Sequence, residues 1–288
     1  MVLESLSNPW KAEHRPYILL LWGAVYAIIA GFLALLLFPR SLQSMVLVAL
    51  STIAALPLIY NTIKYEEQKD VRIEGEQKLL KEHSKAVVVF LMLFIGMTLG
   101  MTALYVLLPV ESAVSLFSGQ IDTYKAINPA QEVTGHATQS SVFNRIFMNN
   151  LKVLFFCVVF SLLYGAGSMF VLAWNASVIA LAMGNVIRTK FALLASQAGA
   201  ASIASYFKII IIDSFSRYFI HGIFEIASYV IAALAGGIIS AAIIKKHFGT
   251  DKTDHIVLDV SDLLLASFVI LLFAALIETY VTPVLFGL

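Results

Sequence analysis

Residues 17–38 read YILLLWGAVYAIIAGFLALLLF, and residues 42–60 follow with LQSMVLVALSTIAALPLIY; only Pro39, Arg40 and Ser41 separate the two runs. Neither run contains a charged residue. About 20 mostly apolar residues let an α-helix cross the hydrocarbon core of a bilayer. The two runs therefore predict a tight transmembrane helical hairpin. The first run is too long for a secretory signal peptide, and no small-residue cleavage site separates it from the next span.

The composition of the whole chain agrees with this prediction. Of its 288 residues, 60% are hydrophobic and 13% are charged, whereas a soluble domain carries about 25% charged residues. These values exclude an ordinary cytosolic enzyme. The 19 Lys and Arg residues balance 18 Asp and Glu residues, so we expect no nucleic-acid partner bound through a basic patch. The single cysteine, Cys157, lies in an apolar run, which excludes a disulfide framework and a thiolate metal cluster.

Further apolar runs bring the expected number of spans to seven, at residues 86–108, 151–173, 176–187, 219–244 and 263–281. The fold class is therefore all-α, a polytopic transmembrane helical bundle. The run at 176–187 has about twelve residues and is a short span, a re-entrant segment or part of a helix broken at Trp174-Asn175. In the last case Asn175 caps the break. Residues 191–212 form a surface helix, a re-entrant helix or a further crossing.

The distribution of charge divides the chain into three parts: a hairpin (1–60), a charged connector (61–85) and a five-span core (86–288). The connector carries six Lys and Arg residues, against two in the 109–150 loop. Because short cytoplasmic loops are rich in Lys and Arg, we expect a multi-pass plasma-membrane protein with a cytoplasmic N-terminus. The alternating charges of the connector favour a solvated helix, with a docking surface for a partner as the alternative.

Ionisable side chains within the spans mark a candidate site. Arg217, His221 and Glu225 recur every four residues and share one face of the sixth span. Glu278 lies at a comparable depth in the seventh span, and Asn150 heads the fourth span from the same side. We expect these five residues to form a buried polar cluster. It would lock the helices together, handle an ion or a proton, or bind a metal through His221, Glu225 and Glu278; the HExxH pattern of metallopeptidases is absent.

Small residues predict where helices approach closely. Gly96 and Gly100 form a GxxxG motif, and the sixth span carries two ridges, at 232/236/240 and at 233/237/241. Packing within one bundle is the first interpretation, and homo-oligomerisation through one ridge is the alternative.

Several short motifs, taken together and in order, resemble the stage II sporulation protein M family over about residues 86–288. They are Phe147-Met148-Asn149-Asn150-Leu151, Tyr164-Gly165-Ala166-Gly167, Trp174-Asn175, His221-Gly222-Ile223-Phe224-Glu225-Ile226, and Ala274 to Glu278 with Thr282-Pro283. The resemblance implies a five-span core with a cytoplasmic N-terminus. It also implies a membrane scaffold, which in spore formers works with cell-wall hydrolases during engulfment. It adds no catalytic chemistry.

The leading functional hypothesis is a non-enzymatic scaffold that organises a membrane complex, without a catalytic residue or a cofactor. Its partners would be the lipid bilayer and proteins of that complex. The alternatives are a transporter or channel that uses the polar cluster and, third, a metal-dependent intramembrane hydrolase.

Overall fold

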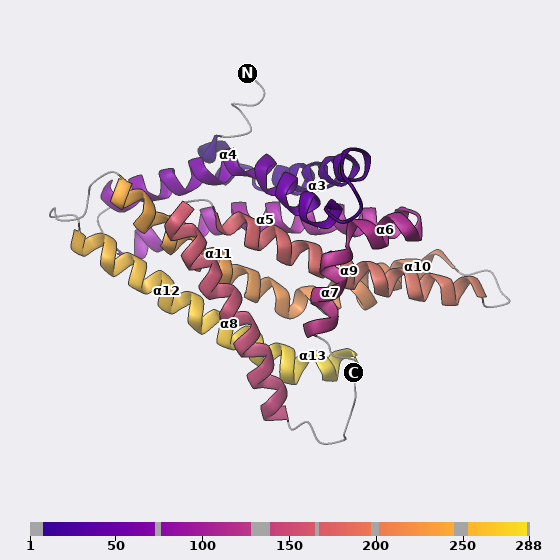
Figure 1. The fold of residues 1–288 in the computed structure, drawn as a ribbon. Coiled ribbons are helices and arrows are strands. Elements are labelled where there is room, and N and C mark those ends of the chain that lie inside the picture. Colours follow the sequence, from indigo (N-terminus) through magenta and orange to yellow (C-terminus); the bar gives the residue numbers. More distant parts are fainter. Residues whose placement is uncertain are drawn as a thin grey trace.

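The computed structural model describes residues 8–72, 76–127, 139–164, 167–196, 202–244 and 253–286. Within these ranges the chain is helical and contains no strand. Figure 1 shows long helices lying side by side, with the short α6 and α7 near one end of the bundle. The elements are α2 (Pro9–His14), α3 (Ile18–Leu37), α4 (Gln43–Arg72), α5 (Glu76–Leu107), α6 (Val110–Leu116), α7 (Ser118–Ile127), α8 (Gln139–Tyr164), α9 (Ser168–Ser196), α10 (Ile203–Lys208), the π-helix η1 (Ile209–Ser216), α11 (Arg217–Ile244), α12 (Thr253–Leu276), the π-helix η2 (Ile277–Val281) and α13 (Thr282–Phe286).

Seven helical stretches in the described residues are long and apolar enough to cross a membrane, which confirms the expected number of spans. They are Ile18–Leu37, Gln43–Lys69, Lys81–Leu107, Gln139–Leu163, Ser168–Ser196, Ile203–Ile244 and Thr253–Phe286. The all-α bundle predicted from the sequence is therefore the observed fold.

The GxxxG motif of α5 packs against α3 of the same chain. A Cβ atom added at Gly100 would lie 2.6 Å from the carbonyl oxygen of Ala24, and one added at Gly96 would meet the backbone of Leu20. Only glycine allows the two backbones to approach so closely. The motif thus fixes the first span of the hairpin on the core.

The small residues of α11 likewise pack against other helices of the same chain. A Cβ atom at Gly236 would lie 2.7 Å from the carbonyl oxygen of Val158 in α8, and one at Gly237 would lie 2.8 Å from the side chain of Ile63 in α4. The Ser161 hydroxyl donates to the Ala233 carbonyl over 2.6 Å. Both ridges therefore make contacts inside one bundle.

The prediction of a helix break at Trp174-Asn175 is wrong. One helix, α9, runs from Ser168 to Ser196 through both residues, so the expected short fifth span is also wrong. The reason is local: the Asn175 side-chain amide donates to the Val171 carbonyl over 2.8 Å, one turn back in the same helix. This bond satisfies the polar group without a break.

Residues 191–212 do not form a candidate span of their own; the described ones belong to the stretches Ser168–Ser196 and Ile203–Ile244. The end of α9 and the α10–η1 segment lie side by side, as Figure 1 shows. The Phe191 and Tyr206 rings meet edge to face with centroids 4.9 Å apart, and the Lys190 ammonium lies 2.6 Å from the Asp213 carboxylate. The described residues of this segment therefore extend the fifth and sixth candidate spans, which pack against each other here.

The connector at 61–85 differs from the expected solvated helix. Its two ends continue α4 and α5, but Glu66, Lys69 and His83 are buried. They are buried because α2 packs against both α4 and α5, and α12 packs against α4, so that part of the connector lies in the interior of the bundle.

Candidate functional site

The polar residues predicted from the sequence line a cavity of about 540 Å³ between α8, α9 and α11. Asn150 on α8 enters it from one side, and His221 and Glu225 on α11 enter it from the other. The Asn150 side-chain amide donates to the Glu225 carboxylate over 2.6 Å. Asn175 on α9 also lines the cavity, so this residue belongs to its wall and not to a helix end.

Glu278 on η2 completes the cluster, although it lies 53 residues after Glu225. Its carboxyl group and that of Glu225 line the same cavity. The His221 Nε2 atom is 4.0 Å from the Glu278 carboxylate, and its Nδ1 atom is 3.3 Å from the Thr282 hydroxyl. We call Asn150, His221, Glu225 and Glu278 the cavity cluster.

Arg217 does not join the cavity cluster. Its guanidinium lies over the ring of Tyr218, 5.7 Å from the ring centroid, and it is not among the residues that line the cavity. Arg145 and Lys152 of α8 do line the cavity, together with Tyr124 of α7. The cavity therefore faces the end of the bundle at which α7 lies.

The metal interpretation finds no support in the geometry. Among the described residues, no three His, Cys, Asp or Glu side chains are placed to hold one ion, and this includes His221, Glu225 and Glu278.

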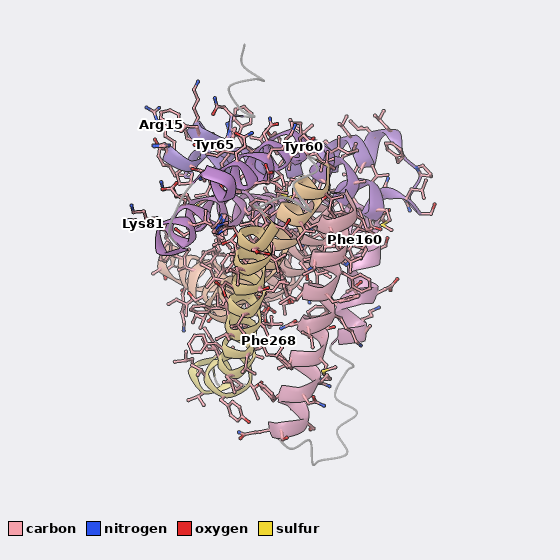
Figure 2. All side chains as sticks on the ribbon, turned by 90° about the vertical axis from the view of Figure 1, so that its left-hand side faces the viewer. Arg15, Tyr60, Tyr65, Lys81, Phe160 and Phe268 are labelled. Carbon is pink, nitrogen blue, oxygen red and sulfur yellow. The ribbon has the colours of Figure 1, made fainter. Side chains whose placement is uncertain are left out.

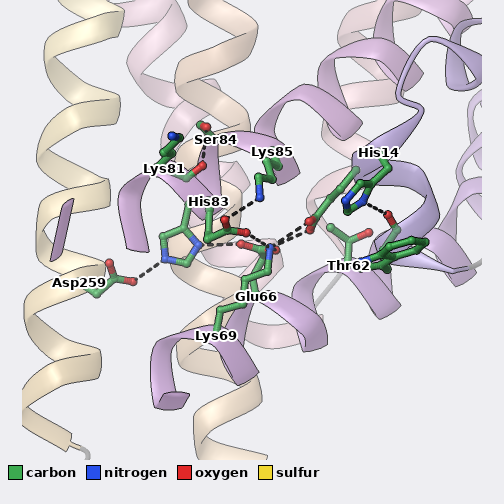
Figure 3. Close-up of polar contacts among 12 residues, drawn as sticks. His14, Thr62, Glu66, Lys69, Lys81, His83, Ser84, Lys85 and Asp259 are labelled. Atoms are coloured by element: carbon green, nitrogen blue, oxygen red, sulfur yellow. Dashed lines mark hydrogen bonds and ion pairs between the residues drawn. The ribbon is translucent and has the colours of Figure 1, made fainter. Parts of the chain in front are cut away.

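A second group of ionisable residues, which the sequence did not reveal, is buried at the opposite end of the bundle (Figure 3). His83 on α5 lies between two carboxylates: its Nδ1 atom is 2.8 Å from Glu66 on α4, and its Nε2 atom is 3.1 Å from Asp259 on α12. Each ring nitrogen thus has a carboxylate within hydrogen-bonding distance, an arrangement in which the protonated ring would donate to both. The contact between His83 and Asp259 joins positions that are 176 apart in the sequence.

Lys69 extends this network to the first helix of the chain. Its ammonium donates to Glu66 over 2.8 Å and to Glu13 on α2 over 2.9 and 3.1 Å, and it lies 3.4 Å from Glu82. The side chains of Lys69, Glu66 and Glu13 are 8%, 0% and 2% exposed. We call Glu13, Glu66, Lys69, His83 and Asp259 the network; it joins α2, α4, α5 and α12.

Glu13 shows the cost of this arrangement. Burial raises the pKa of its carboxyl group from 4.5 to about 7, and the bond from Lys69 offsets only part of that effect. Lys69 is shared among three carboxylates, so it does not neutralise Glu13 completely.

One signal in the sequence could have identified the network. Ile59 and Ile63 are buried in α4, and Glu66 and Lys69 continue the same three- to four-residue spacing beyond them. The buried face of α4 therefore extends past the apolar run. Asp259 lies before the last apolar run, which begins at residue 263, whereas α12 begins ten residues earlier than that run, at Thr253.

The chain matches a family model described as stage II sporulation protein M over residues 86–283. No match is found among curated proteins or among solved structures. The matched range contains the whole cavity cluster. Of the network it contains only Asp259, because Glu13, Glu66, Lys69 and His83 precede residue 86.

Proposed function

The chain belongs to the stage II sporulation protein M family, and from that premise we propose that it transports a small cation, the proton included, through its cavity cluster. The observation that carries the proposal is the pair of carboxyl groups, Glu225 and Glu278, that line one cavity within the membrane-crossing helices. Ionisable residues at such positions are costly and are retained where an ion or proton is handled.

The charge arrangement of the cavity favours a cation over an anion. Two neighbouring carboxylates repel strongly in surroundings poor in water, and a bound cation or a shared proton removes that repulsion. Lys69 and His83 lie against the carboxylates of the network, whereas in the cavity His221 is 4.0 Å from Glu278. Arg145 and Lys152 also line the cavity, but among the described residues neither forms an ion pair with Glu225 or Glu278. The carboxyl pair thus borders room for a cationic ligand.

We also propose that the protein lies in the plasma membrane with its N-terminus in the cytoplasm. The excess of Lys and Arg in residues 61–85 over the 109–150 loop supports a cytoplasmic N-terminus in the plasma membrane. The cavity, which faces the α7 end, then opens to the outside.

The test is cation flux into liposomes that contain the purified protein, with a pH-sensitive dye for protons and radioactive tracers for alkali cations. Glu225→Gln removes the charge but keeps an oxygen that can accept from Asn150, so the fold should remain and flux should fall at least tenfold. Glu111→Gln, an equal change at an exposed position on α6, is the matched control. Equal flux for wild type and Glu225→Gln at equal folded protein would contradict the proposal.

A non-enzymatic scaffold is the second candidate. It is favoured by the hydrogen bonds that join three helices through the cavity cluster, from Asn150 to Glu225 and between His221 and Thr282. On this hypothesis the wild-type protein shows no flux above empty liposomes. Glu225→Ala then lowers both the melting temperature and the amount of partner protein that cross-linking recovers from native membranes.

A further inference from the structure

A crevice of about 640 Å³ lies between α2 and the beginning of α3, at the end of the bundle that holds the network. Lys11, His14 and Arg15 line it on the α2 side, and all three are exposed. Ile18 and Trp22 line it on the α3 side, where the first membrane-crossing helix begins. The crevice thus has a basic wall next to an apolar wall.

Among the described residues, which begin at Asn8, no acidic residue lines this crevice. The one acidic residue of α2, Glu13, is turned to the other side and bonded to Lys69 over 2.9 Å. The network therefore has a second consequence: it holds α2 on the bundle with its basic face outward. Figure 2 shows Arg15 at the edge of the bundle with its side chain directed away from it.

Local bonds hold the basic wall in place. The Asn8 side chain accepts from the Lys11 backbone N–H over 3.2 Å and caps α2. The His14 Nδ1 atom donates to the Trp10 carbonyl over 2.7 Å, and the two rings lie 4.3 Å apart. This bond, drawn in Figure 3, leaves the His14 Nε2 atom for another partner.

We propose that this crevice binds the phosphate headgroup of an anionic phospholipid. Lys11, His14 and Arg15 would contact the phosphate, and the acyl chains would lie against Ile18 and Trp22. Basic residues next to a membrane-crossing helix attract anionic headgroups, and tryptophan rings favour the interface between lipid and water. A free phosphate ion shares the headgroup chemistry, but it would leave the apolar wall of α3 without a partner, so we commit to the lipid.

Native mass spectrometry of the delipidated, full-length protein tests the proposal. Phosphatidylglycerol and phosphatidylcholine with identical acyl chains are titrated in turn. Wild type should bind one phosphatidylglycerol at least tenfold more tightly than phosphatidylcholine. The double variant Lys11→Gln/Arg15→Gln should bind phosphatidylglycerol roughly thirtyfold more weakly, because each cation near an anionic lipid contributes about a fivefold factor.

The matched control is Lys125→Gln/Lys208→Gln, which removes two exposed cations from α7 and α10, away from the crevice. Its affinity for phosphatidylglycerol should equal that of wild type. Equal affinity for the two lipids, or equal loss in both double variants, would overturn the proposal. Displacement of the lipid by millimolar inorganic phosphate would overturn the assignment to a lipid.

Fluorescence gives a second measurement that does not depend on mass resolution. The chain has three tryptophans, and two of them, Trp10 and Trp22, line the crevice. In a Trp174→Phe background, phosphatidylglycerol with brominated acyl chains should quench the emission more than brominated phosphatidylcholine does. Lys11→Gln/Arg15→Gln should abolish that difference, and a difference that survives would contradict the proposal.

Discussion

In both the cavity cluster and the network a histidine lies near carboxylates, and the two groups are at opposite ends of one bundle. In the network both nitrogens of His83 lie within 3.1 Å of a carboxylate, and Lys69 adds a second cation. In the cavity cluster His221 is 4.0 Å from Glu278, and the carboxyl groups border a cavity of about 540 Å³. This difference indicates that nearby opposite charges and an adjacent cavity, more than residue type, distinguish a site that can accept a ligand from a structural network.

We expect the largest effect from His83→Ala, which removes the central residue of the network. His83→Ala leaves Glu66 and Asp259 buried with one cation fewer, and removal of one partner from a buried ion pair costs about 3–5 kcal/mol. We expect a fall in melting temperature large enough to reduce the yield of folded protein. His221→Ala should cost less than half as much, because His221 makes one hydrogen bond and one long ion pair.

Thermal unfolding in detergent measures both variants, with His255→Ala, an exposed position on α12, as the control. Equal losses for His83→Ala and His221→Ala would remove the distinction between the two clusters.

The next effect compares one substitution at two sites. Glu66→Gln removes the charge that faces both Lys69 and His83 and should cost about 2–3 kcal/mol. Glu225→Gln keeps an acceptor for Asn150 and relieves the repulsion with Glu278, so it should change stability by less than about 1 kcal/mol. The two unfolding free energies, measured under the same conditions, check this, and a larger loss for Glu225→Gln would reverse our assignment.

A smaller effect concerns pH. The pKa of Glu13 in the folded protein, about 7, is above its ordinary value of 4.5. The folded state therefore binds the proton more tightly, and this contribution to stability is present below about pH 4.5 and is lost as the pH rises through about 7. Glu13→Gln should flatten the fall in melting temperature between pH 5 and 8. An unchanged slope would show that Glu13 does not titrate in this window.

The sequence was sufficient for the parts of the molecule that depend on local spacing. Seven apolar runs gave the spans. The four-residue interval between His221 and Glu225, with the similar depth of Glu278, anticipated that the three would meet. The same four-residue interval puts Arg217 on the helix face that carries His221 and Glu225. Arg217 lies one turn before His221, however, outside the cavity and over the ring of Tyr218.

The rest depended on tertiary contacts that no local pattern specifies. The bond between His83 and Asp259 joins positions 176 residues apart, and the charges of the connector alone suit a solvated helix equally well. Within α9 the Asn175 side chain bonds to the preceding turn, whereas asparagine is more common at helix caps.

The most direct test of the central claim is cation flux per folded molecule in liposomes, with Glu278→Gln compared against Asp259→Asn. Both substitutions remove one carboxylate beside a histidine, one in the cavity cluster and one in the network. We predict that Glu278→Gln abolishes flux while the protein stays folded, and that Asp259→Asn lowers stability while the remaining folded protein keeps its flux. The opposite pattern, with flux lost in Asp259→Asn and unchanged in Glu278→Gln, would contradict the assignment of cation transport to the cavity cluster.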